Sequence, residues 1–221
     1  ELVKSIIEQG QPSTEQPESG TQNSVQGAPA TGFHRREIRT KVALSNGLAT
    51  SDRFLLLGGA GFGKSAALRA VTHSLLDDSG RFPALAKLWG QRLPLLLPFG
   101  FLTRHFVENE TPTVEGALKA WLMVLGAKNE VLALLEEMLG DERLLLLVDG
   151  LDEWQNREAA VAALTALTTY VQNRQLPLVA TARPLGFERI SDFGPDWKHG
   201  NLLSLTTEQQ REFVSYWFKH F

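Results

Sequence analysis

The chain contains no cysteine among its 221 residues. This excludes disulfide bonds, zinc–thiolate sites and a cysteine nucleophile, and it fits a reducing compartment, so we expect a cytoplasmic protein. The five histidines are scattered, with no HExxH or paired-ligand spacing, which argues against a metal site built from protein ligands alone. No apolar run reaches the length of a membrane span, and no signal peptide is visible.

The chain also lacks a strong charge of either sign. Its 22 basic and 25 acidic side chains give a net charge of −3, which favours neither nucleic acid nor a membrane surface as a partner. The hydrophobic fraction of 43% is enough for a full core. The length suits one α/β domain with additions, or a piece of a longer protein, and the first residue, Glu1 rather than Met, favours a piece.

The N-terminal segment, residues 1–31, has few large apolar side chains. Those among the first seven residues could form one short helical face, and the rest is rich in Gln, Ser, Glu, Pro and Gly, as a linker is. We therefore predict a polar linker over 1–31 that follows an upstream domain, and one nucleotide-binding domain over 32–221.

From residue 33 onward, short apolar runs alternate with segments of helical periodicity. This alternation predicts an α/β fold with a five-stranded, mostly parallel sheet and helices on both faces. The strands are expected at 54–57, 93–98, 144–148, 178–181 and 201–205. The helices are expected at 33–49, after residue 65, at 114–125, 131–139 and 159–171, and after a possible capping box at 206–209.

A glycine-rich loop, GGAGFGKS, follows the first apolar strand and precedes a helix. Glycines let the backbone curl so that several N–H groups point at one anion, and the helix N-terminus adds partial positive charge. We predict a phosphate-binding P-loop in which Lys64 reaches the β- and γ-phosphates and Ser65 ligates Mg²⁺. The flanking strand and helix disfavour the alternative, a turn that binds nothing. The expected nucleotide-binding residues are Gly58, Gly59, Ala60, Gly61, Phe62, Gly63, Lys64, Ser65 and Ala66.

A second motif, LLLLVDGLDE, is an apolar strand that ends in acids. Ligands of parallel sheets bind at the C-terminal ends of strands, so we expect Asp149 to hold Mg²⁺, through a water molecule. Asp152 or Glu153 would orient or deprotonate the water that attacks the γ-phosphate. Either acid could instead cap the next helix. We favour Glu153 as the polarising group, although the sequence does not separate the pair.

A third segment, TARP, ends the following strand. If that strand lies between the P-loop strand and the acidic strand, its C-terminal end faces the γ-phosphate. Arg183 would then report whether this phosphate is present, because a guanidinium suits phosphate oxygens. The alternative is an exposed surface arginine before a strand-ending proline.

These three segments together resemble the NACHT family within the STAND class of P-loop NTPases, over about residues 54–221. The closing TTEQQREFVSYWF helix is also similar to the segment after the last NACHT strand. The resemblance implies a nucleotide-driven switch that acts in defence, inflammation or programmed cell death and assembles when activated. It implies an upstream effector domain and a downstream sensor, beyond helical and winged-helix modules that would follow Phe221.

The predicted activity is slow, regulatory hydrolysis of ATP with Mg²⁺, with Asp152, Glu153 and Arg183 as the catalytic candidates. GTP is possible, although no [NT]KxD signature of Ras-like GTPases is present. The adenine pocket is poorly marked: residues 33–37 are as consistent with an ordinary helix start as with a nucleotide motif. Two alternatives stay open, an AAA+-like or DNA-associated ATPase and a scaffold that binds nucleotide without hydrolysing it. The first lacks a basic track for nucleic acid.

Overall fold

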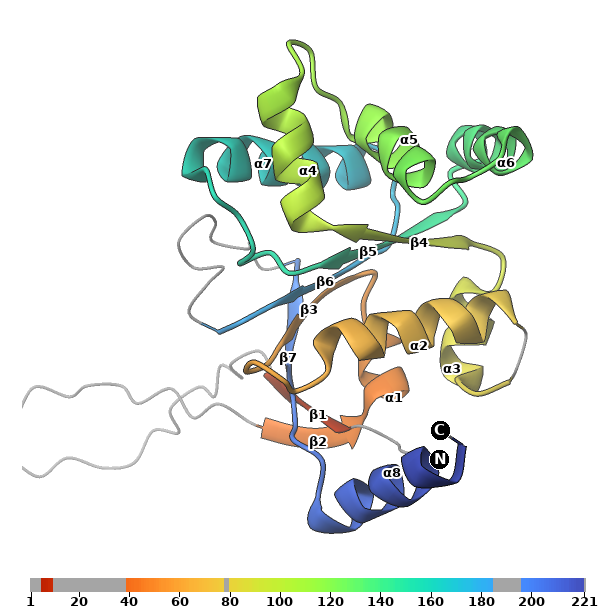
Figure 1. Ribbon diagram of the computed structural model, residues 1–221, viewed down its shortest axis with the longest axis vertical. Coiled ribbons are helices and arrows are strands. Elements are labelled where there is room, and N and C mark those ends of the chain that lie inside the picture. The colour runs from red at the N-terminus through yellow and green to blue at the C-terminus, as the bar shows by residue number, and fades with distance from the viewer. Residues whose placement is uncertain (1–4, 10–38, 78–79, 185–195, 221) are drawn as a thin grey trace, which may run out of the picture.

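The fold is built on one mixed sheet with helices on both faces (Figure 1). The structure is a computed structural model that describes residues 5–9, 39–77, 80–184 and 196–220. The strand order is β2-β1-β7-β3-β6-β5-β4. Five neighbouring strands are parallel: β7 (Lys198–Leu202), β3 (Arg53–Leu57), β6 (Leu178–Ala182), β5 (Leu144–Asp149) and β4 (Leu93–Pro98).

Two antiparallel strands extend this sheet at the β7 edge. They are β1 (Ser5–Gln9), which pairs with β7, and β2 (Arg39–Ala43), which pairs with β1. The predicted five-stranded parallel sheet is therefore confirmed, and the described chain adds two strands to it.

The helices form a layer on each face of the sheet (Figure 1). One layer holds α1 (Leu44–Leu48), α2 (Lys64–Leu76) and α3 (Pro83–Trp89). The other holds α4 (Phe99–Glu108), α5 (Val114–Val124), α6 (Asn129–Gly140) and α7 (Arg157–Asn173). The last helix, α8 (Thr207–His220), follows β7. None of the described helices combines the length and the apolar character needed to cross a membrane.

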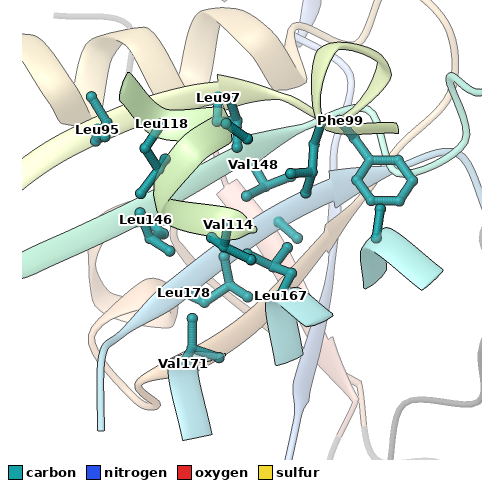
Figure 2. Packing of buried hydrophobic residues seen from close by; sticks show 14 of the residues in the cluster. Leu95, Leu97, Phe99, Val114, Leu118, Leu146, Val148, Leu167, Val171 and Leu178 are labelled. Carbon is teal, nitrogen blue, oxygen red and sulfur yellow. The ribbon is translucent and has the colours of Figure 1, made fainter. Parts of the chain in front are cut away.

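The central strands are apolar without interruption because both of their faces are covered. In β5, Leu144, Leu146 and Val148 pack under α4–α7, where Figure 2 shows Leu146 and Val148 among side chains of α5 and α7. The alternate residues Leu145 and Leu147 pack under α1–α3. All five are fully buried. Each such leucine contributes about 1.5–3 kcal/mol of transfer free energy, so the two clusters hold the sheet between its helical layers.

Several sequence predictions on the N-terminal side were wrong. The helix expected over 33–49 is, within the described residues, the strand β2 followed by the short helix α1. The short helical face expected near the N-terminus is the strand β1 over Ser5–Gln9. Pairing between these two strands decides both cases, since helical spacing of a few apolar residues is a weak local signal. Residues 10–31 of the predicted linker lie outside the described residues.

The C-terminal half agrees more closely with the sequence predictions. The last strand is β7 at Lys198–Leu202, three residues before the predicted start. The capping box that opens α8 is confirmed: the Gln209 amide donates to the Thr206 hydroxyl, and the Thr206 amide donates to Gln209 Oε1, at 3.3 and 2.9 Å.

The helices α3 and α4, which lie earlier in the chain, were not predicted.

Candidate functional site

The glycine-rich loop connects the C-terminal end of β3 with the first turn of α2, at the edge where parallel sheets bind ligands. Gly61 and Gly63 have φ angles of 75° and 82°, a left-handed region that costs other residues strain. A Cβ atom added to Gly59 would lie 3.2 Å from the Phe62 ring, so a larger residue there would require this exposed ring to shift. The glycines therefore permit a tightly curled loop.

The N-terminus of α2 presents unpaired amides. Gly63 precedes the helix and provides no side-chain cap, and the first helical bond runs from the Ala67 amide to the Gly63 carbonyl at 2.9 Å. Within the described part of the chain, the amides of Lys64, Ser65 and Ala66 have no hydrogen-bond partner. Free amides at a helix N-terminus form an anion site, as the predicted P-loop requires.

The Lys64 side chain lies across this loop. Its ammonium donates to the Gly58 carbonyl at 2.8 Å and to the Gly59 carbonyl at 3.1 Å. Among the described residues no carboxylate forms an ion pair with it. A phosphate can therefore attract the ammonium without separating it from an acidic partner.

Asp149 ends β5 and is held by the neighbouring strand. The Thr181 hydroxyl of β6 donates to Asp149 Oδ1 at 2.6 Å and accepts from the Gly150 amide at 2.9 Å. The Thr181 carbonyl accepts from the Leu151 amide at 2.8 Å. Because β6 pairs with both β3 and β5, it lies between the P-loop strand and the acidic strand, which was the condition for Arg183 to face the γ-phosphate.

Asp152 and Arg183 bind each other. Asp152 Oδ1 accepts from the Arg183 amide at 2.9 Å, and Asp152 Oδ2 lies 3.0 Å from Arg183 Nε. The Asp152 side chain is 8% exposed, whereas that of Arg183 is 56% exposed. Asp152 is thus engaged by both the backbone and the side chain of Arg183, and more than half of the Arg183 side chain is exposed to solvent.

Glu153 follows on the same loop and is exposed. Its amide donates to the Gly150 carbonyl at 2.8 Å, which closes a tight turn in which Gly150 has a φ of 74°. A Cβ atom on Gly150 would lie 2.8 Å from Glu153 Cδ, so the Glu153 side chain lies over this glycine. Neither Asp152 nor Glu153 caps α7, because Asn156 does so by accepting from the Ala159 amide.

A cleft of about 980 Å³ opens beside these acids. Its lining includes Asp152, Glu153 and Arg183, together with Arg104 of α4 and Trp121 of α5. The wall from α4 and α5 was missed at the sequence level, because neither helix carries a motif and α4 was not predicted. One residue in the sequence does reflect this wall, namely Gly100 in the first turn of α4. A Cβ atom at Gly100 would lie 2.9 Å from the Glu153 carbonyl oxygen, so the close approach of the two segments requires glycine.

The residues present fit a magnesium ion held mainly by nucleotide and water. The described residues contain no group of three or more His, Asp or Glu side chains that could hold a metal ion. Mg²⁺ keeps several waters and binds through one or two protein oxygens plus substrate phosphates, so one hydroxyl and one carboxylate suffice. Ser65 in the first turn of α2 and Asp149 at the end of β5 would provide that pair.

Comparison with known proteins identifies the family. A family model of the NACHT domain matches residues 52–221, most of the chain and all three motifs. The chain belongs to the NACHT family. It therefore contains a P-loop NTPase domain of a nucleotide-binding family, and the resemblance inferred from the motifs is confirmed. The segment 33–37, for which the sequence left an adenine-side motif and an ordinary helix start open, lies outside the described residues.

Other comparisons add little to this NACHT assignment. Among solved structures, the chain is similar to AMPPCP-bound DnaA from Aquifex aeolicus, at 15% identity and a TM-score of 0.43. That similarity covers 76% of this chain and 45% of the DnaA chain. A search of curated proteins gave no match.

Proposed function

We propose that this NACHT domain is a signal-transduction switch that binds ATP with Mg²⁺, hydrolyses it slowly, and couples its nucleotide state to oligomerisation and effector activation. The proposal rests on the hydrogen bonds and the ion pair that connect the C-terminal ends of β5 and β6 beside the P-loop strand. There Thr181 binds Asp149, and Asp152 binds Arg183. Candidate metal-binding, water-positioning and phosphate-sensing groups thus belong to one connected unit.

Nucleotide binding is assigned to the loop from Gly58 to Ala66. The free amides at the start of α2 would hold the phosphates, and Lys64 would exchange its two carbonyl acceptors for phosphate oxygens. Ser65 and Asp149 would hold Mg²⁺, which neutralises charge on the β- and γ-phosphates when bound. ATP is the proposed nucleotide, with GTP as the alternative.

The attacking water is assigned to Glu153. Asp152 already accepts from the amide and the guanidinium of Arg183, whereas Glu153 is exposed at the same edge. A free carboxylate can accept a proton from water or orient it, a role that typically contributes about 10²–10⁴-fold to a rate. The geometry thus favours Glu153 for water and Asp152 for positioning Arg183.

A switch requires one group that distinguishes the two nucleotide states, and Arg183 is that candidate. A ligand shifts an equilibrium only by its differential affinity for the two states. Arg183 lies just past the C-terminal end of β6, and Asp152 holds it there through a contact that a γ-phosphate would compete for. Binding of ATP, and not of ADP, would therefore change how the two strand ends are joined.

The wider role follows from family membership and is also proposed. The domain would operate in the cytoplasm between an upstream effector domain and a downstream sensor, in defence, inflammation or cell death. Self-association on activation would be its output. An AAA+-like remodelling role would require processive turnover or stimulation by nucleic acid, and a scaffold would bind nucleotide without turnover.

Titration calorimetry tests the proposal. Wild-type protein should bind ATP–Mg²⁺, and Lys64→Ala should abolish binding, because the ammonium is the loop's only side-chain cation for the phosphates. Lys87→Ala, an exposed lysine in the last turn of α3, is the matched control and should bind as wild type. Unchanged affinity in a folded Lys64→Ala protein would exclude the loop as the site. Single-turnover hydrolysis by wild type then separates a switch from a scaffold.

A further inference from the structure

Thr181 is a fully buried polar residue in an otherwise apolar strand. The strand β6 reads Leu-Val-Ala-Thr-Ala, and every residue in it is buried. A buried hydroxyl needs hydrogen-bond partners to offset its lost hydration, so its presence in this strand calls for an explanation. The explanation lies in the residues that it contacts.

The Thr181 hydroxyl makes two bonds whose directions are fixed. It accepts from the Gly150 amide at 2.9 Å, and a backbone N–H can only donate, so it cannot accept the hydroxyl proton. Its single proton is therefore free for Asp149 Oδ1, the acceptor at 2.6 Å. Within the described residues, no other donor contacts the Asp149 carboxylate. The orientation of this carboxylate thus depends on one hydroxyl from the neighbouring strand.

We propose that Thr181 is a positioning residue for magnesium: its hydroxyl orients the Asp149 carboxylate so that the remaining oxygen, Oδ2, is available to the ion or its water. This rests on the proposed function. Removing a group that hydrogen-bonds to a metal ligand and orients it typically lowers the metal affinity by about 10–100-fold. Thr181 is fully buried, so it would act through Asp149 and not by contact with the nucleotide or the ion.

The alternative is that Thr181 serves only to satisfy the Gly150 amide and hold the turn. That role would affect nucleotide binding equally with and without the metal, since it acts on the shape of the loop. A positioning role acts only on the magnesium-dependent part. The two roles are therefore distinguished by measuring ATP affinity in EDTA and across a Mg²⁺ titration.

The variants are Thr181→Val, which keeps the shape and removes the hydroxyl, and Thr181→Ser, which keeps the hydroxyl. Thr168→Val on α7 is the matched control, because its hydroxyl bonds only to helix carbonyls. We expect Thr181→Val to need about 10–100-fold more Mg²⁺ for half-maximal ATP binding, with ATP affinity in EDTA unchanged within about twofold. Thr181→Ser should stay within about threefold of wild type, and Thr168→Val should equal it.

A double variant completes the test. In an Asp149→Asn background, Thr181→Val should add no further loss of Mg²⁺ dependence, because the group that it orients is already altered. An unchanged Mg²⁺ requirement in Thr181→Val, or an equal loss in EDTA and in Mg²⁺, would overturn the inference. If Thr181→Val does not fold, Thr181→Ala takes its place. The inference would also be overturned if Thr181→Ser increased the Mg²⁺ requirement for ATP binding as much as Asp149→Asn does. A wild-type protein that binds no ATP under either condition is a different result, and it refutes the proposed function itself.

Discussion

The contact between Arg183 and Asp152 leads to a quantitative prediction for nucleotide discrimination. Replacing Arg183 with alanine should weaken ATP binding and leave ADP binding unchanged, because on the proposed function only ATP would bring a γ-phosphate to the end of β6. In this structure the guanidinium already binds Asp152, with Nε 3.0 Å from Oδ2. A γ-phosphate must therefore compete with an existing ion pair, and the measured loss is the difference between two interactions.

The size of that difference follows from the exposure of the pair. A hydrogen bond between charged groups contributes about 1.5–3 kcal/mol. The competing pair is worth less, about 0.2–1 kcal/mol, because the arginine side chain is 56% exposed and solvent screens it. The net loss of ATP affinity in Arg183→Ala is then about 0.5–2.8 kcal/mol, or about 2- to 100-fold in Kd.

Asp152→Asn is the companion variant. The amide oxygen of asparagine can still accept from the Arg183 backbone N–H, whereas the ion pair is lost. We expect ATP affinity to rise by about 1.4- to 5-fold and ADP affinity to stay constant, which follows from the screened pair energy above. Arg211→Ala, an exposed position on α8, serves as the control for a lost arginine charge.

Calorimetric titration of each variant with ATP–Mg²⁺ and ADP–Mg²⁺ provides the measurement. Equal losses for ATP and ADP in Arg183→Ala, or no loss for either, would refute the sensing role. A fall in ATP affinity in Asp152→Asn would refute competition and would instead indicate that Asp152 presents the guanidinium to the phosphate.

Two other predictions concern hydrolysis and stability. Glu153→Gln should slow single-turnover ATP hydrolysis by about 10²–10⁴-fold and leave ATP affinity nearly intact, whereas wild-type rates in Glu153→Gln combined with lost turnover in Asp152→Asn would reverse the assignment within this pair. Leu118→Ala should lower the free energy of unfolding by about 2–5 kcal/mol in a urea titration, because Leu118 is fully buried between α5 and the sheet (Figure 2). Leu134→Ala on α6, where the side chain is 40% exposed, should lower the free energy of unfolding far less. Equal decreases in the two variants would contradict the burial of Leu118 in the core.

The parallel strands could be predicted because a strand that is buried on both faces is an uninterrupted apolar run in the sequence. The run LLLLVD was predicted as a strand on this ground, and it is β5. The strand at 93–98 was harder, because Pro94 and Pro98 lie within it and proline cannot donate to a ladder. The structure explains them, since β4 is the edge strand and, among the strands that the structure describes, pairs only with β5. An edge strand has one side on which a missing N–H costs little.

The first strands could not be predicted, because their cause is not local. The segment Arg39–Ala43 alternates in polarity only weakly, and nearby apolar residues suggested a helix. Its strand conformation depends on β1, which is thirty residues upstream and itself pairs with β7 near the other end of the chain. No window of ten or fifteen residues contains these partners. The helix α4 was missed for a different reason, since it begins directly after β4 with no side-chain cap at its start.

In the candidate site too, features within one segment could be predicted, whereas a contact between distant segments could not. The P-loop and Asp149 can be read from single segments, because each motif carries its own strand and turn. The pairing of Asp152 with Arg183 spans 31 residues and becomes visible only when β6 is placed beside β5. The sequence argument treated the two as separate catalytic candidates. The structure brings them into one contact, which supports the preference for Glu153 over Asp152 as the group that would polarise the water.

That contact and the Thr181 bond lie on one connected path, and this has a mechanical consequence for the proposed switch. The loop after β5 is joined to β6 at Gly150 and Leu151 through Thr181, and at Asp152 through Arg183. A movement of Arg183 toward a γ-phosphate would therefore release the Asp152 carboxylate in the short loop that follows Asp149 and carries Glu153. Metal binding, water positioning and phosphate sensing would then respond together, because two strand ends joined by several hydrogen bonds at 2.6–2.9 Å have little freedom to move separately. A switch built in this way needs no large rearrangement at the nucleotide, since displacing one arginine from one carboxylate is enough to change the junction of two strands.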